Sequence, residues 1–145
     1  MLSHAGLKEE AERRIDALGP SNCTLSVISL SAPHLPERVL ERAVGAAATP
    51  YDAIGALADG SIAVFAMRPQ GVEAGAGMED RFLGRLSSAL AGLCGQRASQ
   101  PLTVRSVHRW ASETDDSQAL FSALFAAARR TVLLRGPSML RASLR

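Results

Sequence analysis

An Asp-Gly pair lies between two apolar segments near the middle of the chain and limits the folds open to it. Residues 51–58 and 61–67 are rich in apolar side chains, and Asp59-Gly60 separates them. An Asp-Gly pair in this setting favours a two-residue type I′ turn, in which both central residues take positive φ. The sequence therefore predicts a β-hairpin, and with it at least one antiparallel pair of strands.

Hydrophobic periodicity predicts helices and further strands on both sides of this hairpin. Apolar residues recur at helical spacing over residues 7–18, 36–48, 78–93 and 117–130. Segments 23–30 and 102–110 are β-branched or alternate apolar with polar side chains, as strands do, and 131–134 reads as a short final strand. This order predicts an α/β (α+β) fold, in which helices cover a single mixed, mostly antiparallel sheet of about five strands with a central hairpin.

The length of 145 residues suits one domain. We expect an N-terminal amphipathic helix and linker over residues 1–22, the main domain over 23–136, and an arginine-containing tail over 137–145. No apolar run approaches the roughly 18 uncharged residues of a membrane span, and the first helix carries too many charges for a secretory signal. We therefore expect a cytoplasmic protein with no membrane partner.

Residues that bind transition metals are too scattered to form a site. The two cysteines, Cys23 and Cys94, lie far apart in the sequence, and the three histidines are not spaced to act together. We predict no metal and no cofactor.

The positive charge of the chain is concentrated near its C-terminus. The net charge is only +2, but residues 129–145 contain five arginines and no acidic residue. Such a segment is either a solvated tail or a surface for nucleic acid or an acidic partner. The absence of aromatic residues in this segment counts against stacking on single strands.

Around the hairpin, the chain resembles the GGDEF domain of bacterial diguanylate cyclases. The segment 52–65 is similar to the family pattern of an Asp, five residues, the signature and an apolar strand, with Ala58-Asp59-Gly60-Ser61-Ile62 in place of the signature. Residues 123–128 are similar to the closing helix of the family. The resemblance implies a nucleotidyl cyclase-like fold.

The residues that would carry the chemistry of this family are replaced. Family members make cyclic di-GMP from two GTP, with divalent metal held by an Asp at the end of the first strand and by an acid in the signature. The first of these positions falls on Ser29 or Ser31, and the second on Ser61. Neutral hydroxyls do not replace carboxylates as ligands for hard cations. The lysine of the closing helix falls on Ala128, and the arginine of the inhibitory product site falls on Thr49. The resemblance therefore implies a protein that is not an enzyme.

These observations lead to three hypotheses of function. The first is a catalytically inactive GGDEF-like regulatory module of cyclic di-GMP signalling that acts by contact with a protein partner or as a homodimer, with Trp110 and Arg135 as candidate contact residues. Trp110 is alternatively a core residue. The second is a sensor that binds GTP or cyclic di-GMP without turnover. Its candidate ligand-binding residues are Asp59, Gly60, Arg129 and Arg130. The third is nucleic-acid binding through the C-terminal arginines.

Overall fold

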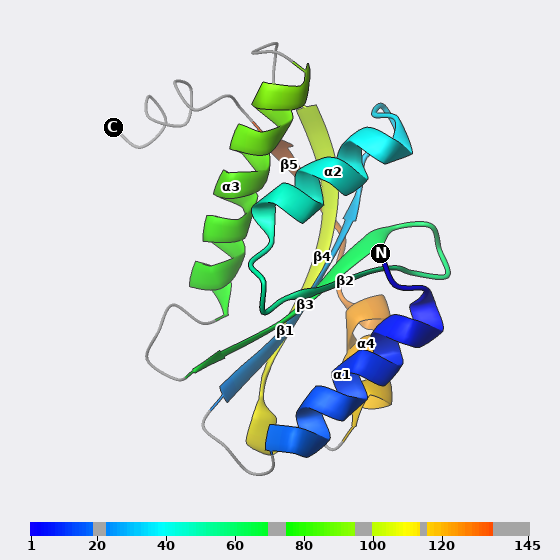
Figure 1. The fold of residues 1–145 in the computed structure, drawn as a ribbon, viewed down its shortest axis with the longest axis vertical. Helices are drawn as coiled ribbons and strands as arrows, with labels where there is room; N and C mark the ends of the chain where they lie inside the picture. The colour runs from blue at the N-terminus through cyan, green and yellow to red at the C-terminus, as the bar shows by residue number, and fades with distance from the viewer. Residues whose placement is uncertain (19–22, 70–74, 95–99, 114–115, 135–145) are drawn as a thin grey trace.

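The chain forms one five-stranded antiparallel sheet with helices on both faces (Figure 1). The computed structural model describes residues 1–18, 23–69, 75–94, 100–113 and 116–134. Its elements are α1 (His4–Leu18), β1 (Cys23–Ser31), α2 (Glu37–Ala47), β2 (Ala53–Ala56), β3 (Ile62–Pro69), α3 (Ala76–Cys94), β4 (Gln100–Trp110), a 3₁₀ turn η1 (Ala111–Glu113), α4 (Ser117–Ala126) and β5 (Arg130–Leu134).

The strand order is β2-β3-β1-β4-β5, and all four neighbouring pairs are antiparallel. The sheet predicted as mixed is therefore antiparallel throughout, apart from an isolated parallel bridge between Leu2 and Gly55 at its edge. The helices α2 and α3 connect β1 to β2 and β3 to β4, which is the split β-α-β arrangement. This order places β1 at the centre of the sheet.

Each face of the sheet carries its own apolar core. On one face, alternate residues of the strands, including Ile28, Leu30 and Val64, pack with α2 and α3. On the other face, Val27 and Phe65 pack with α1 and α4. In Figure 1, α2 and α3 lie over the upper part of the sheet, and α1 and α4 lie at its lower part. Because successive side chains of a strand point to opposite faces of the sheet, each strand contributes residues to both cores.

The helix α1 belongs to this packed structure. Leu7 and Ala11 are fully buried in the second core. Just before the helix, Leu2 bonds to the edge of β2: its amide donates to the Ile54 carbonyl at 3.0 Å, and its carbonyl accepts from the Ala56 amide at 2.8 Å.

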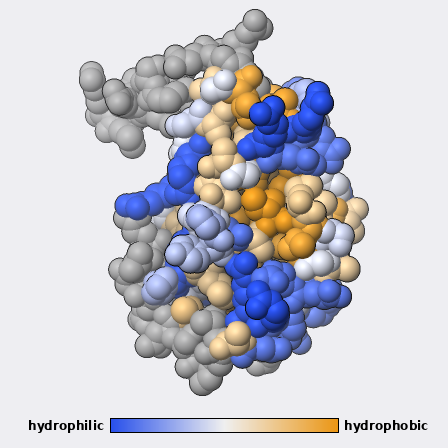
Figure 2. All heavy atoms as spheres, viewed as in Figure 1, coloured by the Kyte–Doolittle hydropathy of each residue, from blue (hydrophilic) through white to orange (hydrophobic). Residues whose placement is uncertain are grey.

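In Figure 2, apolar side chains gather in the middle of the visible face, between the hydrophilic surfaces of α2 and α1. No helix of the described residues is long and apolar enough to cross a membrane.

The central hairpin is present, but its turn differs from the predicted type. Of the residues in the turn, only Gly60 takes positive φ, at 87°, and no described residue other than glycine has a positive φ. The Gly60 amide donates to the Leu57 carbonyl at 3.0 Å, and the Leu57 amide donates to the Ser61 carbonyl at 2.8 Å. This is a three-residue loop with a left-handed glycine at its end. The prediction of a two-residue type I′ turn is wrong, because Asp59 stays at negative φ and its carboxylate accepts from the Ser61 amide at 3.0 Å.

The last helix is shorter than predicted. Asp116 caps it, since its side chain accepts from the Ala119 amide at 2.8 Å. The helix ends at Ala126, and Ala127 is extended, with φ −71° and ψ 149°. The sequence 127–129 has good helix formers, but the pairing of β5 with β4 requires the chain to leave the helix before Arg130. Tertiary pairing overrides local propensity here.

Candidate functional site

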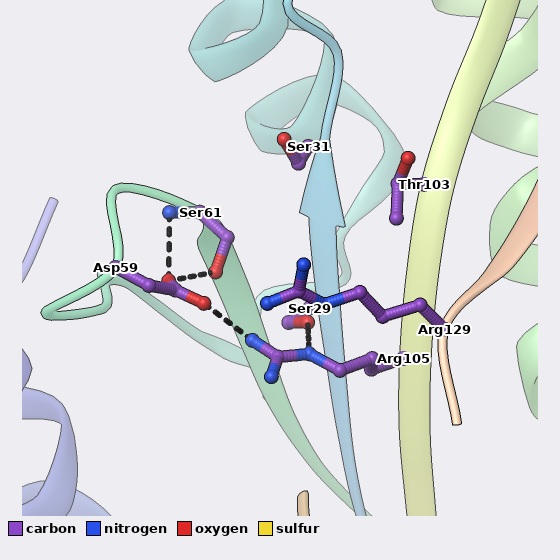
Figure 3. Close-up of a pocket in the computed structure, with 7 residues that line it drawn as sticks. All are labelled: Ser29, Ser31, Asp59, Ser61, Thr103, Arg105 and Arg129. Atoms are coloured by element: carbon purple, nitrogen blue, oxygen red, sulfur yellow. Dashed lines mark hydrogen bonds and ion pairs between the residues drawn. The ribbon is translucent and has the colours of Figure 1, made fainter. Parts of the chain in front are cut away.

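The candidate site is a pocket on the face of the sheet that α1 and α4 only partly cover (Figure 3). Its volume is about 180 Å³. Seven of the described residues line it: Ser29, Ser31, Asp59, Ser61, Thr103, Arg105 and Arg129. They come from β1, the β2–β3 hairpin, β4 and the residue before β5, so segments far apart in sequence meet in one place.

The alternation of the strands explains why this pocket is polar. On this face of β1, Leu25 and Val27 are buried in the core beneath the helices, and the next two residues on the same face are Ser29 and Ser31. The same change occurs along β4, where Val107 lies in the core and Arg105 and Thr103 lie in the pocket. Across the strands, Ser29 is opposite Arg105 and Ser31 is opposite Thr103. One half of this face therefore stabilises the fold and the other half presents hydroxyls and cations.

An ion pair between Arg105 and Asp59 connects the sheet to the hairpin. The guanidinium of Arg105 donates to the Asp59 carboxylate through Nη2, and its Nε lies 3.4 Å from the Ser29 hydroxyl. The Ser61 hydroxyl donates to Asp59 at 2.6 Å. The ring of Phe125 covers the guanidinium at 5.0 Å, a cation–π contact. Arg105 is only 6% exposed, so this pair fixes the floor of the pocket.

The environment of Asp59 keeps its carboxylate ionised. Burial opposes ionisation, but hydrogen bonds from the hydroxyl and amide of Ser61, and then the Arg105 guanidinium, outweigh it and lower the pKa of Asp59 below its usual value of 3.8. At neutral pH, Asp59 is therefore an acceptor already engaged by three donors. Among the described residues that line the pocket, it is the only carboxylate.

Arg129 supplies the uncompensated charge of the site. It is exposed, and in Figure 3 its side chain extends, like that of Arg105, toward the hairpin. Within the described ranges, no carboxylate lies at ion-pair distance from Arg129, whereas the charge of Arg105 is matched by Asp59. Four hydroxyl side chains surround these two guanidinium groups. This donor set is suited to an anion with several oxygen atoms, such as a phosphate.

The donor set does not suit a metal ion. In the part of the chain that the structure describes, no three His, Cys, Asp or Glu side chains come together as metal ligands. Ser61 and the two alternatives for the first-strand position in the resemblance, Ser29 and Ser31, lie in one pocket. They offer neutral hydroxyls beside two cations, which repel a divalent cation.

The structure brings only some of the predicted ligand-binding residues together. Asp59 and Arg129 line the pocket. Gly60 instead lines a neighbouring hollow, which has a volume of about 300 Å³ and lies at the start of α2. Arg130 is on the opposite face of the sheet, where it forms an ion pair with Glu79 of α3, so its assignment to this site is corrected. Arg129 and Arg130 face opposite ways, and the other three arginines of the nucleic-acid hypothesis, Arg135, Arg141 and Arg145, lie outside the described residues.

The predicted contact residues lie away from the pocket. Trp110, at the far end of β4, is 42% exposed, which corrects its alternative assignment to the core. It borders a shallow hollow with Thr24, Gly75 and Arg109. Arg135 lies outside the described residues.

Sequence reasoning missed Arg105 and Thr103. Both were part of the alternating pattern of residues 102–110, which predicted a half-buried strand. An arginine in the interior of such a strand is the signal that could have identified them, because a buried guanidinium needs a partner. The partner, Asp59, is 46 residues away in sequence.

The carboxylate of Asp52 is engaged by contacts within the fold. It forms a salt bridge with Arg68 at 2.9 Å and accepts from the Thr49 amide at 2.9 Å. The Asp52 side chain is 1% exposed. Asp52 therefore fixes the start of β2 and is already occupied.

A second polar cluster joins α3 to the sheet on the opposite face. The Nδ1 atom of His108 lies 2.7 Å from the Ser26 hydroxyl, and its Nε2 atom lies 3.0 Å from Glu79. The spatial arrangement of Ser26, His108 and Glu79 is one that a nucleophile and its base would have. However, Ser26 is only 1% exposed and lies in the middle of the central strand. A substrate has no access to this hydroxyl, so the cluster is structural.

No protein-family model, curated protein or solved structure matches this chain. The pocket and its chemistry are therefore the basis for any assignment of function.

Proposed function

We propose that this chain is a non-catalytic regulatory module that binds a phosphate-bearing ligand, a nucleotide such as GTP or cyclic di-GMP, in the pocket between Arg105, Arg129 and the β2–β3 hairpin. The observation that carries the proposal is the donor set: two guanidinium groups and four hydroxyls around a single carboxylate that is already paired. Charged donors of this kind recognise phosphate oxygens by short, strong hydrogen bonds.

The proposal includes the interpretation of the chain as a degenerate GGDEF-like domain. Support comes from the position of the pocket, which lies where β1 ends beside the hairpin and gathers Ser29, Ser31 and Ser61. In the resemblance, the positions of the two metal-binding acids fall on Ser29 or Ser31 and on Ser61. A site that has exchanged carboxylates for hydroxyls is expected to hold phosphate without metal and without in-line transfer.

The size of the pocket limits what it encloses. A volume of about 180 Å³ is below the range of roughly 300–1,000 Å³ for sites that enclose a drug-sized ligand. We therefore expect the phosphate to be held in the pocket, while the rest of the ligand lies against the rim, where Gly60 borders the neighbouring hollow.

Calorimetric titration with GTP, cyclic di-GMP and pyrophosphate, each with and without magnesium, tests this proposal. We expect micromolar binding of at least one nucleotide that does not require magnesium, and a loss of about tenfold in affinity in Arg129→Ala. Arg42→Ala, which removes an exposed arginine of α2, is the matched control and should bind normally. Absence of binding in every titration, or equal binding by both variants, would contradict the proposal. Turnover of GTP would show that the chain is an enzyme.

A further inference from the structure

The two arginines of the candidate pocket differ in the charge that they offer to a ligand. Arg105 is 6% exposed and donates to the Asp59 carboxylate, which balances its charge. Arg129 is exposed, and none of the ion pairs between described residues includes it. Among the described residues that line the pocket, Arg129 is therefore the source of one unbalanced positive charge.

The Asp59 carboxylate is itself part of the surface that a ligand meets. It lines the pocket with a side chain that is 32% exposed, and Figure 3 shows it beside the Arg105 guanidinium, at the hairpin end of the pocket. Burial raises the pKa of Asp59, but the hydrogen bonds from Ser61 and Arg105 outweigh burial and hold the pKa below its usual value of 3.8. Asp59 is therefore a fixed negative charge at neutral pH.

The remaining groups around the pocket are neutral. Hydroxyls of Ser29, Ser31 and Thr103 line it, and they donate hydrogen bonds to phosphate oxygens without balancing a charge. The first negative charge of a phosphate can pair with the unbalanced arginine. A second one would lie close to Asp59, without a further unpaired cation among the described residues that line the pocket. A partly enclosed charge without a partner is unfavourable.

The pocket also adjoins free space on two sides. Ser31 lines both the pocket and the neighbouring hollow of about 300 Å³, so these two spaces are next to each other. On the other side, Thr103 lies opposite Thr131 of β5, which is exposed. A phosphate that links two groups needs two such exits, whereas a terminal phosphate needs one.

We propose that the pocket selects a phosphodiester, which carries one negative charge, over a terminal phosphate, which carries two, and that Asp59 determines this selectivity. The ligand class is then a nucleotide whose phosphate links two groups, as in a dinucleotide. One non-bridging oxygen pairs with Arg129, and the hydroxyls of β1 and β4 bind the other. This inference rests on the proposed function, since it concerns the same pocket.

Guanosine 5′-monophosphate and its methyl ester at the phosphate are a matched pair of probes. They share the base and the ribose, but at about pH 7.5 the monophosphate carries two charges and the ester one, because the second pKa of a phosphomonoester is about 6. Each probe is titrated into the isotope-labelled full chain, and the Kd follows from the NMR shifts of backbone amides, including that of Ser61. We expect the ester to bind about fivefold to tenfold more tightly.

A second pH separates the charge of the phosphate from the presence of the methyl group. At about pH 5.5, most of the monophosphate carries a single charge, so its Kd should come within about twofold of that of the ester. The charged groups that line the pocket are Asp59, Arg105 and Arg129, and the ring of His4 stacks on Phe125, which covers Arg105. Titration of a protein group affects both probes, so the ratio of the two Kd values reports the charge of the probe.

Two variants test the role of the carboxylate. At about pH 7.5, Asp59→Asn should bind the monophosphate at least as tightly as the ester, whereas the matched control Asp16→Asn, at an exposed position of α1, should keep the wild-type preference. If Asp59→Asn does not fold, the pH comparison in the wild type decides.

The inference is overturned, and the proposed function stands, if the wild type binds the monophosphate as tightly as the ester or more tightly at the higher pH, or if Asp59→Asn retains the preference for the ester. If neither probe binds, the inference also fails, and the titrations with GTP and cyclic di-GMP decide the proposed function separately.

Discussion

Arg105 and Asp59 form an ion pair that connects the middle of β4 to the turn of the β2–β3 hairpin. The arginine is almost completely buried, whereas the side chain of Asp59 is 32% exposed. The cost of burying the guanidinium is offset by this carboxylate, by the Ser29 hydroxyl and by the ring of Phe125. The same pair shapes the floor of the candidate pocket, so its loss affects both stability and the site.

The first prediction concerns the charge of Asp59. Asp59→Asn keeps an oxygen that can accept from the Ser61 amide, but it leaves the Arg105 guanidinium buried without a counterion. We expect a decrease of about 1–3 kcal/mol in the free energy of unfolding, measured by urea denaturation. The control is Asp16→Asn, at an exposed position of α1, which should change stability by less than about 0.5 kcal/mol. Equal effects of the two substitutions would show that the pair contributes nothing.

The second prediction concerns the pH dependence of stability through His108. Burial of the imidazole, and then the charge of Arg109, lower the pKa of His108 below its usual value of 6.5. The neutral ring satisfies both contacts when Nε2–H donates to Glu79 and Nδ1 accepts from the Ser26 hydroxyl. Because the pKa in the folded state is below that in the unfolded state, the stabilisation is complete above pH 6.5 and declines as the pH falls toward the folded-state pKa.

Urea denaturation at about pH 7.5 and about pH 5.5 measures this dependence. The wild-type chain should be less stable at the lower pH. His108→Gln should lose less stability between the two values, whereas His34→Gln, at an exposed position, should behave like the wild type. If His108→Gln retains the full pH dependence, another group is responsible for it.

The sequence shows that the side chains of β1 and β4 alternate between the two faces of the sheet. It does not show that the polar residues of the two strands meet in one pocket. The pattern shows that Ser29 and Ser31 share a face, and that Thr103 and Arg105 share one. Whether these two faces are the same depends on the register, which places Ser29 opposite Arg105. Whether that half of the face is covered depends on where α1 and α4 pack. Neither is encoded in local periodicity.

The hairpin shows the same limit at the level of a turn. The Asp-Gly pair correctly predicted antiparallel strands, because Gly60 provides the positive φ that the connection needs. It did not predict the three-residue loop, since the choice depends on Asp59 bonding to Ser61 and to a residue of another strand. Likewise, Arg129 and Arg130 are adjacent in the sequence, but they contribute to different faces once β5 pairs with β4.

The last prediction compares two glycines that the fold uses differently. At Gly55 in β2, an added Cβ would lie 2.8 Å from the Cβ atom of Leu7 and 3.0 Å from the carbonyl oxygen of Leu2. Leu7 is fully buried, so neither neighbour moves without shifting the N-terminal segment from the sheet. Gly55→Ala should therefore destabilise the chain by about 1–3 kcal/mol.

At Gly45, on the exposed side of α2, an added Cβ would meet no atom within 4 Å beyond its chain neighbours and the backbone of its own helix. The same substitution there should stabilise the chain by up to about 1 kcal/mol, because alanine restricts the unfolded backbone and favours the helix. Urea denaturation of the two variants should show shifts of opposite sign in the midpoint at an unchanged slope. A neutral Gly55→Ala would mean that α1 does not pack closely on β2, and would contradict the covering of that edge by Leu2.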